Sequence, residues 1–375
     1  MEKRGSRSTP EQLRAEVRRF LQDEMAAGVF EPHCNAWMTR FDPAFSRRLA
    51  ERGWLGLTWP TEYGGHGSTA RHRLVVTEEL LASGAPVGAH WIADRQMGPN
   101  LLTFGSEELK RELLPRIARA EVFFCIGMSE PDSGSDLASV RTRAARVAGG
   151  WQLNGTKVWT TGAHVADLMM TLVRTRPASS DRHAGMSQVI VDLRAPGVSV
   201  TPIESMDGAH HFNQVVLEDV FVPDSHLVGT EGNGWQQVTA ELAFERSGPE
   251  RYLSTFPLLE AWAKTLPVDR LADPAVQDLG LILARLWALR EMSAEIADAI
   301  AAGRSPAVEA ALVKDLGWAL ERDVIDVVRR HRVPGADRRL DRLLIESIHD
   351  APTFSLRGGT PEILRGVVAR SLGVR

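Results

Sequence analysis

The segment Met128-Ser-Glu-Pro-Asp-Ser-Gly-Ser-Asp136 is a polar turn rich in hydroxyls and carboxylates, and it follows directly on an apolar run that starts at Val122. A second segment, Asn154-Gly-Thr-Lys-Val-Trp-Thr-Thr161, opens on an Asn-Gly pair, which is a hairpin signal. Backbone amides and hydroxyls in such turns can bind the edge of a flavin and the oxygens of a phosphate or pantetheine. A Trp beside them can cover an aromatic ring. The two segments are therefore candidates for a ligand-binding site.

The composition is that of an ordinary globular protein with room for two or three domains. The chain has 375 residues, of which 43% are hydrophobic and 25% charged. Its net charge of -4 gives no electrostatic reason to expect nucleic acid or an anionic membrane as a partner. The two cysteines, Cys34 and Cys125, make no disulfide framework. Cys125 lies in an apolar run, which favours a buried small hydrophobe over a nucleophile.

The sequence also lacks the signals of metal sites and of membrane insertion. No metal-ligand spacing occurs, and no run of 18 apolar residues is present. The N-terminus is charged and has no apolar signal core. We therefore expect no metal and a cytoplasmic location.

The first two regions differ in periodicity. Residues 1–120 are predicted to be helical, with Thr9, Pro10 and Gln12 starting a helix by a capping box. Residues 121–223 contain short β-rich runs separated by turns, which indicates a small β-barrel or sandwich. There is neither strand-helix alternation nor a G-x-G-x-x-G motif, so a Rossmann fold is disfavoured. The predicted strands are Val122–Ile126, Leu168–Val173, Gln188–Leu193, Val198–Ile203 and Val215–Val222.

Residues 224–375 return to long helices. Apolar residues recur at helical spacing in two segments, and four or five such helices predict a bundle. The class expected for the whole chain is α+β, mostly α. The apolar positions are Leu279, Leu283, Leu286, Ile296 and Ile300 in one helix, and Val308, Leu312, Leu316, Leu320, Val324 and Val327 in the next.

Together with the C-terminal segment Gly358-Gly-Thr-Pro-Glu-Ile-Leu-Arg365, the two opening segments resemble the acyl-CoA dehydrogenase family. The resemblance covers essentially the whole chain, and its motifs are specific in combination although each alone is weak. It implies an N-terminal helical domain, a middle β-barrel-like domain and a C-terminal helical bundle. It also implies FAD-dependent α,β-dehydrogenation of an acyl-CoA thioester, in the β-oxidation of fatty acids or steroid side chains.

That reaction needs a base for the α-proton, a stabiliser of the enolate-like oxygen and a flavin to accept the β-hydride. The family places its base at one of two positions. One is Gly358 here, which has no carboxylate; the other is Glu245, beside Arg246. The resemblance therefore implies Glu245 as the base, and the other interpretation is an ordinary helix Glu in a salt bridge. The Gly358 N–H is still able to hydrogen-bond the thioester carbonyl, and the same turn also fits a simple helix entry with Thr360 as cap.

The same resemblance implies the cofactor and substrate contacts. Met128 and Ser129 would lie at the isoalloxazine edge, and Trp159 and Thr161 at its face and N5 side. The alternatives are a Trp in the core of the β domain, and Ser or Thr side chains that cap backbone groups in turns. The remaining implied contacts are Thr360 and Glu362 near the adenine half or the ring, Ser135 at the CoA moiety, and Arg246 at its phosphates or pantetheine.

Two family features are absent. The region from Arg251 to Arg270 lacks the Arg-x-x-Phe-Gly string that contacts the flavin pyrophosphate of a neighbouring subunit. Arg329-Arg-His-Arg-Val-Pro-Gly-Ala336 stands where a Gly-Gly-x-Gly loop is typical, and its arginines either meet a pyrophosphate or form a solvated basic face. A heterotetramer with a homologous subunit would supply the missing half of each site. A homo-tetramer or dimer with a different adenosine pocket is the alternative.

Three functions remain open at this level. The first is an acyl-CoA dehydrogenase that passes electrons to an electron-transfer flavoprotein. The second is an acyl-CoA oxidase or flavin monooxygenase on the same fold, and the third is a non-catalytic partner subunit. The small residues Ser247 and Gly248 leave room for a bulky or branched acyl group, carried either on CoA or on a carrier protein.

Overall fold

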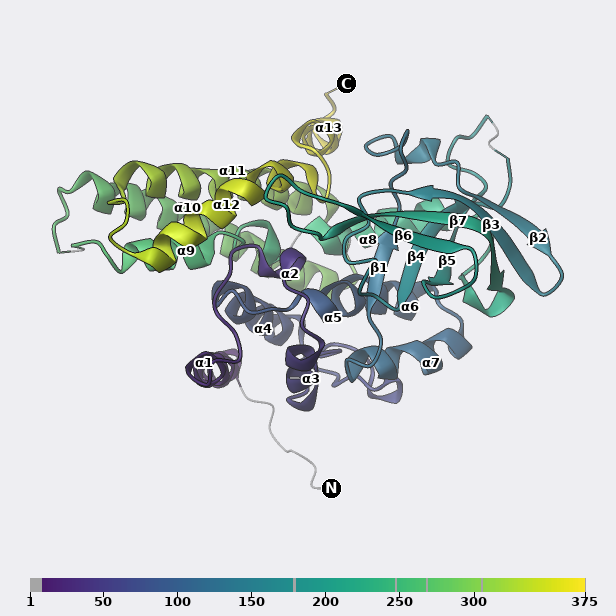
Figure 1. The fold of residues 1–375 in the computed structure, drawn as a ribbon, viewed down its shortest axis with the longest axis horizontal. Helices are drawn as coiled ribbons and strands as arrows, with labels where there is room; N and C mark the ends of the chain where they lie inside the picture. The colour runs from purple at the N-terminus through teal and green to yellow at the C-terminus, as the bar shows by residue number, and fades with distance from the viewer. Residues whose placement is uncertain (1–8, 178–179, 247, 268, 305, 375) are drawn as a thin grey trace. The chain divides into compact units, whose positions relative to one another are not determined.

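The computed structural model describes residues 9–177, 180–246, 248–267, 269–304 and 306–374, and for residues 242–245 it describes the backbone alone. The chain forms two compact units (Figure 1). The helical unit comprises Met1–Trp37, Ser68–Pro86 and Arg246–Arg375, and the sheet unit comprises Met38–Gly67 and Val87–Glu245. The mostly helical α+β class is confirmed, with a central sheet between two helical stretches of sequence. The predicted domain limits at residues 120 and 223 stay a prediction.

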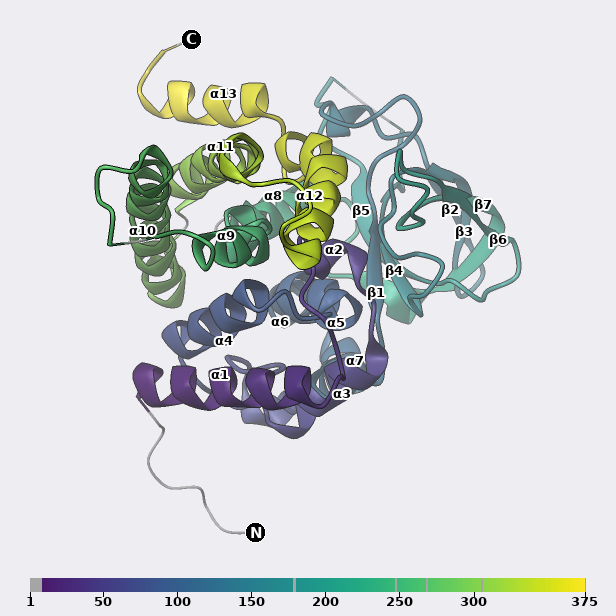
Figure 2. The same ribbon diagram turned by 60° about the vertical axis from the view of Figure 1, so that its left-hand side comes forward.

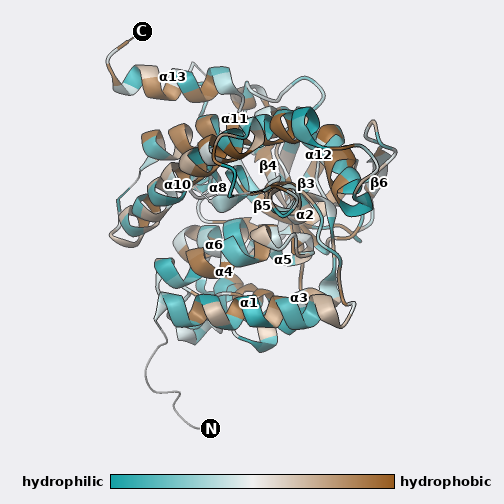
Figure 3. Ribbon diagram, turned by 90° about the vertical axis from the view of Figure 1, so that its left-hand side faces the viewer, coloured by the Kyte–Doolittle hydropathy of each residue, from teal (hydrophilic) through white to brown (hydrophobic). Residues whose placement is uncertain are grey.

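The helical unit begins with α1 (Pro10–Ala26), and the predicted capping box is present. The Thr9 hydroxyl accepts from the Gln12 N–H, and the Gln12 side chain accepts from the Thr9 N–H. Figure 3 shows hydrophilic and hydrophobic residues alternating along α1. Its apolar side packs on α4 (Ala70–Ala82), which runs beside it in Figure 2. The residues buried on that side are Leu13, Val17, Phe20 and Leu21, as the spacing predicts.

After Arg246, the described residues of the helical unit form a short 3-10 helix (Pro249–Arg251) and then five α-helices. The two longest of these, α10 and α11, pack against each other, and α12 and α13 pack on α11. Figure 2 shows α9, α11 and α12 grouped together, with α13 next to α11. The helices are α9 (Phe256–Ala263), α10 (Pro274–Ala301), α11 (Ala307–His331), α12 (Arg338–Leu356) and α13 (Pro361–Ser371).

The predicted apolar faces of α10 and α11 are wrong in part. Leu283 and Leu316 are exposed, at 46% and 50%. The buried face of α11 instead includes Lys314 and Glu321, both fully buried. Sequence periodicity counts apolar side chains, so it cannot find a buried face that carries paired charges.

The sheet unit places its helices before and after the sheet. A π-helical turn, Ala93–Met97, joins α5 to α6, and its Met97 is fully buried against the Trp59 cluster. Gly98 follows, and a Cβ there would lie 2.0 Å from the Trp59 ring, so only glycine allows this packing. The helices are α3 (Pro43–Glu51), α5 (Gly88–Ile92), α6 (Gly98–Phe104), α7 (Glu107–Ala118) and α8 (Gly234–Arg246). The division between the two units falls within α2 (Ala36–Thr39) in the sequence.

One sheet of eight strands forms the centre of this unit. Its order is β6-β7-β3-β2-β4-β5-β8, and β1 pairs parallel to β4. The five predicted runs all contribute strands, whereas β2, β3 and β8 were not predicted. The strands are β1 (Phe124–Gly127), β2 (Arg143–Val147), β3 (Gly150–Lys157), β4 (Leu168–Arg174), β5 (Met186–Asp192), β6 (Val198–Ile203), β7 (Phe212–Pro223) and β8 (Leu227–Val228).

The hairpin expected at Asn154-Gly155 is wrong. These residues lie inside β3, where the pairing with β7 shifts register between Leu153 and Gly155. The Asn154 amide donates to Asp219 Oδ1 at 2.9 Å and its Oδ1 accepts from the Asp219 N–H at 3.0 Å. The Asn-Gly pair thus forms a β-bulge, and the true hairpin turn joins Val147 to Gly150.

Candidate functional site

The sheet unit brings the ends of two strands together at the predicted flavin edge. Met128 and Ser129 directly follow β1, and Val158 directly follows β3. The Val158 N–H donates to the Ser129 carbonyl at 2.9 Å, which joins the two segments. The N–H groups of Met128 and Ser129 themselves make no hydrogen bond to any residue that the structure describes. They are therefore donors available to an external acceptor.

A buried ion pair supports this junction. Lys157 Nζ lies 2.8 Å from Glu130 Oε1 and also donates to the carbonyls of Met128 (3.2 Å) and Leu172 (2.7 Å). Glu130 further accepts from the Thr142 N–H at 2.8 Å. Burial lowers the pKa of Lys157 to about 8, against the attraction of Glu130. Burial pushes the pKa of Glu130 upward, but the nearby Lys157 and its hydrogen bonds hold that pKa below its ordinary value, so the pair is charged at neutral pH.

Trp159 follows this junction in an unusual backbone conformation. Its φ is 57°, and its side chain is 60% exposed although it adjoins a strand of the sheet. The edge of its ring meets Phe212, with the centroids 5.7 Å apart. The interpretation of Trp159 as a core residue is therefore wrong, and more than half of its surface is presented to solvent. Thr160 is buried and Thr161 is half-buried next to it.

Ser135 lies in the turn between β1 and β2. That turn is closed by backbone hydrogen bonds in both directions between Glu130 and Ser133, at 2.7 and 3.1 Å. The Ser133 hydroxyl, which is buried, donates to the Asp136 carbonyl at 3.0 Å. Ser135 is exposed, and its hydroxyl makes no hydrogen bond to the described residues. It is thus accessible, as a substrate contact requires.

In the helical unit, Arg246 and Gly358 come together as a pair. Arg246 Nε donates to the Gly358 carbonyl at 2.9 Å. Gly358 has a φ of 72°, which favours glycine, and a Cβ there would lie 3.2 Å from the Arg251 guanidinium. The Gly358 N–H makes no hydrogen bond to any residue that the structure describes, so it is available as a donor.

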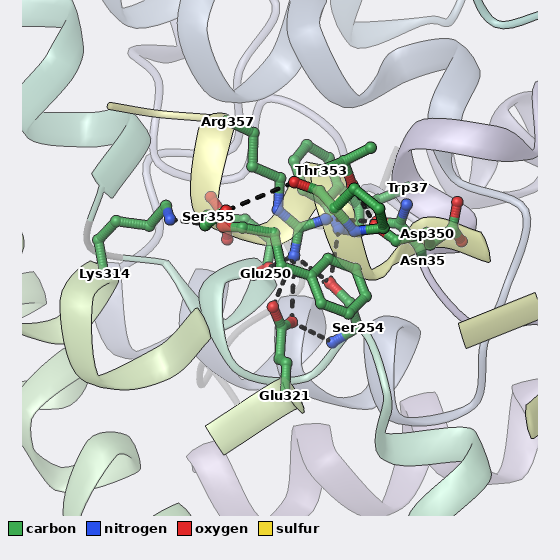
Figure 4. Close-up of polar contacts among 12 residues, drawn as sticks. Asn35, Trp37, Glu250, Ser254, Lys314, Glu321, Asp350, Thr353, Ser355 and Arg357 are labelled. Carbon is green, nitrogen blue, oxygen red and sulfur yellow. Dashed lines mark hydrogen bonds and ion pairs between the residues drawn. The ribbon is translucent and has the colours of Figure 1, made fainter. Parts of the chain in front are cut away.

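Arg357, which directly precedes Gly358, anchors the turn at Gly358 in a buried polar cluster (Figure 4). Arg357 is 7% exposed, and its Nη2 donates to Glu321 Oε2 at 2.9 Å and to the Ser254 hydroxyl at 2.8 Å. Its guanidinium also lies 4.9 Å from the centre of the Trp37 ring. Burial raises the pKa of Glu321 and lowers that of Arg357, while their mutual attraction opposes both shifts.

The other predicted residues of this unit lie at the start of α13. Thr360 is its N-cap by position, but its side chain makes no capping hydrogen bond to the backbone. Glu362 is exposed in the first turn, where a backbone hydrogen bond and the Thr360 hydroxyl hold its pKa below the ordinary value. The Glu245 backbone lies in α8, and its side chain lies outside the described part of the structure. The roles of all these residues stay predictions.

A hollow of about 840 Å³ in the helical unit is a poor candidate for the site. Its carboxylates are already paired: Arg14 binds Glu78 and Glu79 at 2.5 Å, and Arg290 binds Glu78 at 2.9 Å. None of the predicted site residues lines it.

The sequence matches two models of known domains. One is the acyl-CoA dehydrogenase N-terminal domain, over residues 8–121, and the other is the acyl-CoA dehydrogenase middle domain, over residues 125–220. Acyl-CoA dehydrogenase IpdE1 of Mycobacterium tuberculosis is 34% identical to the chain over 97% of both proteins. The chain belongs to the acyl-CoA dehydrogenase family. It is accordingly an oxidoreductase, and the predicted resemblance is confirmed.

Solved acyl-CoA dehydrogenase structures share the fold. The structure described as "Tcur3481-Tcur3483 steroid ACAD" superposes with a TM-score of 0.84 at 28% identity, covering 99% of this chain and 98% of that one. The ChsE4-ChsE5 complex from Mycobacterium tuberculosis gives 0.79 at 29% identity, with full coverage of both chains. Acyl-CoA dehydrogenase FadE29 of the same organism is 38% identical over 76% of this chain and 75% of its own.

Acyl-CoA dehydrogenases generally use FAD, and the residues here fit that group. The available N–H donors of Met128 and Ser129 suit the acceptor atoms along a flavin edge, and the largely exposed Trp159 indole suits its ring. The described residues hold no group of three His, Cys, Asp or Glu arranged for a metal ion. Within the same residues, no helix is long and apolar enough to cross a membrane.

Sequence reasoning missed the residues that support the site. Lys157 and Glu130 were quoted as parts of motifs without a role, and Asn213 was not singled out. The position of the charged Lys157 inside a strand could have indicated its ion pair with Glu130. No sequence pattern marked Asn213, because its contacts with Thr160 and His164 join positions about 50 residues apart in the chain.

Proposed function

We propose that this chain is an FAD-dependent acyl-CoA dehydrogenase with Glu245 as its base. The substrate loses its α-proton to the Glu245 carboxylate and its β-hydrogen as hydride, and a double bond forms between the two carbons. FAD, when bound, accepts the hydride. The observation that carries the proposal is the junction of Met128, Ser129 and Trp159, which combines available N–H donors with a largely exposed indole.

The residues of each unit have separate tasks in this proposal. Met128, Ser129, Trp159 and Thr161 hold and cover the flavin ring, and Ser135 contacts the CoA moiety. The Gly358 N–H donates to the thioester oxygen as negative charge develops there. Arg246 fixes that turn through its 2.9 Å bond to the Gly358 carbonyl, in addition to its proposed contact with CoA.

Two further residues of the helical unit are proposed to contact the cofactor. We propose that Thr360 and Glu362 at the start of α13 lie near the adenine half of FAD or its ring.

We further propose that the protein works as an oligomer with a homologous second chain. Two structural relatives are described as pairs of named chains, Tcur3481-Tcur3483 and ChsE4-ChsE5. The missing Arg-x-x-Phe-Gly string leaves the pyrophosphate end of the cofactor without its usual cation. Two arginines near the end of α11 already have carboxylate partners, so they are poor substitutes for that cation. Arg330 pairs with Asp278 at 3.0 Å, and Arg332 pairs with Asp341.

The proposed substrate is a bulky acyl-CoA of the steroid side-chain class. It is supported by the description of one relative as a steroid acyl-CoA dehydrogenase and by the absence of a side chain at Gly358. We propose an electron-transfer flavoprotein as the electron acceptor and the cytoplasm as the location.

The test is the visible absorption spectrum of the purified protein, alone and with a co-expressed homologous subunit. The proposal predicts a flavin band that bleaches anaerobically with steroid side-chain CoA thioesters and less with short straight-chain ones. Oxygen consumption with peroxide release would instead indicate an oxidase. Bleaching only by carrier-bound thioesters would correct the substrate class. A protein that takes up no flavin, alone or with a homologous subunit, would contradict the proposal.

A further inference from the structure

Trp159 marks an extra residue in the pairing of β3 with β7. Lys157 is opposite Val215, but beyond it the Thr160 N–H donates to the Asn213 carbonyl at 3.0 Å. Between these two pairs, the segment that continues β3 advances three residues (157 to 160), whereas β7 advances only two (215 to 213). Trp159 is in the extra step, at a φ of 57°. The bulge re-aims its side chain away from the sheet, which explains a 60% exposed indole beside a strand.

Asn213 hydrogen-bonds both the N–H and the carbonyl of Thr160, the residue that follows the bulge. Its carbonyl accepts from the Thr160 N–H, and its side-chain Nδ2 donates to the Thr160 carbonyl at 2.9 Å. Asn213 is fully buried. One further bond, from the Gly162 N–H to the His211 carbonyl at 2.8 Å, continues the resumed pairing. The backbone on the C-terminal side of Trp159 is therefore fixed by β7 and the loop before it.

Two histidines also hydrogen-bond the Asn213 amide, whose Nδ2 lies in addition 3.4 Å from the His211 carbonyl. His210 Nε2 lies 2.7 Å from Asn213 Oδ1, and His164 Nδ1 lies 3.1 Å from Asn213 Nδ2. Because Oδ1 only accepts and Nδ2 only donates, His210 Nε2 carries a proton and His164 Nδ1 does not. The two imidazole rings stack with their centroids 3.9 Å apart. This network orients the amide so that Nδ2 faces Thr160.

We propose that Asn213 is a positioning residue for Trp159, and that His210 and His164 orient its amide for this task. A left-handed conformation at a residue with a side chain persists only when the surroundings hold it, and such positions gather at functional sites. The inference rests on the proposed function, because the task of Trp159 is to cover the flavin ring. Asn213 itself touches neither cofactor nor substrate in this account.

The first test compares Asn213→Ala with Asn154→Ala. Asn154 is a matched control, because it also ties a bulge between β3 and β7, through Asp219. Hydrogen exchange of the peptide spanning residues 158–163 is measured on flavin-free protein. We expect at least tenfold faster exchange in Asn213→Ala and no change in Asn154→Ala. Equal exchange in both variants and the natural chain would overturn the role of Asn213, whether or not the protein binds flavin.

The second test reads the flavin. With FAD added, Asn213→Ala should raise its dissociation constant at least tenfold and leave its fluorescence less quenched, whereas Asn154→Ala should match the natural chain. An unchanged constant and unchanged quenching in Asn213→Ala would overturn the proposal. If the natural chain itself binds no FAD, alone or with a homologous subunit, the proposed function fails, and the exchange data still decide whether Asn213 holds the turn.

A milder pair of variants guards against a folding failure of Asn213→Ala. His210 is exposed, so its replacement leaves the core intact. His210→Phe keeps a ring to stack on His164 but removes the donor to Asn213 Oδ1, and His210→Gln keeps a donor. We expect faster exchange at residues 158–163 and weaker quenching in His210→Phe, with recovery in His210→Gln. The same values in both variants would contradict the orienting role of His210.

Discussion

Lys157 and Glu130 form a buried ion pair whose Nζ–Oε1 distance is 2.8 Å, and the Lys157 side chain is completely inaccessible to solvent. The pair connects the middle of the sheet to the turn that carries the predicted flavin contacts, because Lys157 also donates to the Met128 carbonyl. Removing one member leaves an uncompensated charge in the interior.

Lys157→Met should therefore lower the free energy of unfolding by about 3–5 kcal/mol, the usual cost of breaking a buried ion pair. The double variant with Glu130→Gln should recover part of that loss, because no unpaired carboxylate then remains. Denaturant unfolding of the natural chain, the two single variants and the double variant measures the coupling. A double variant as unstable as the sum of the two single ones would show that the pair is not coupled.

Arg357 should behave in the same way in the helical unit. Its partner Glu321 is fully buried, so Arg357→Met should cost about 3–5 kcal/mol. The control is Arg365→Met, whose ion pair with Asp315 is 3.0 Å long but has an exposed arginine. Loss of an exposed pair is expected to change stability by less than about 1 kcal/mol. Equal effects of the two variants on the unfolding midpoint would contradict this account of the cluster.

Gly358→Ala tests the turn that carries the proposed carbonyl donor. The left-handed backbone costs an L-residue about 1–2 kcal/mol, and the added Cβ would also press on the Arg251 guanidinium at 3.2 Å. Gly335→Ala is a matched control, because Gly335 has a φ of 76° but open space around its Cα. We expect similar backbone strain from the positive φ in both variants, but slower flavin reduction by substrate only in Gly358→Ala. Reduction slowed equally in both would remove Gly358 from the site.

The buried imidazole of His90 predicts a loss of stability in mild acid. It lies 2.8 Å from the Ser46 hydroxyl, and burial lowers its pKa to about 4, against a weaker attraction from Asp94. Above pH 6.5 the imidazole is neutral in both states, so its contribution is complete. As the pH falls from about 6.5 to 4, the unfolded chain takes up a proton that the folded chain refuses, which costs up to about 3 kcal/mol. Unfolding midpoints measured across this range should fall less steeply in His90→Gln; equal slopes would contradict the prediction.

The parts of the fold that the sequence predicts are those set by local signals. The capping box at Thr9 and the five β-rich runs depend on neighbouring residues, and both are present. Asn154-Gly155 shows the limit of local signals. The pair has the chemistry of a hairpin turn, but its bond to Asp219, 65 residues away, makes it a bulge inside a strand. A sequence window cannot contain that partner.

The same reason separates the predicted and missed parts of the candidate site. Met128, Ser129 and Trp159 stand in recognisable segments, so a role could be predicted for them. The residues that hold them in place were missed, because their roles arise from contacts across the sheet. Lys157 reaches Glu130 and Leu172, and Asn213 reaches Thr160 and His164. Glu321 and Arg357 were not predicted to be buried, because hydrophobic periodicity assigns charged residues to the surface.

The most direct measurement is anaerobic bleaching of the flavin band by acyl-CoA in Glu245→Gln, with Glu241→Gln as the control. Both residues lie on α8 one turn apart, and Glu241 is a buried carboxylate within 3.4 Å of the side-chain amides of Asn100 and Gln188. The account predicts that both variants bind FAD, that Glu241→Gln is still reduced by substrate, and that Glu245→Gln is not. Reduction of Glu245→Gln at the rate of the natural chain would contradict it.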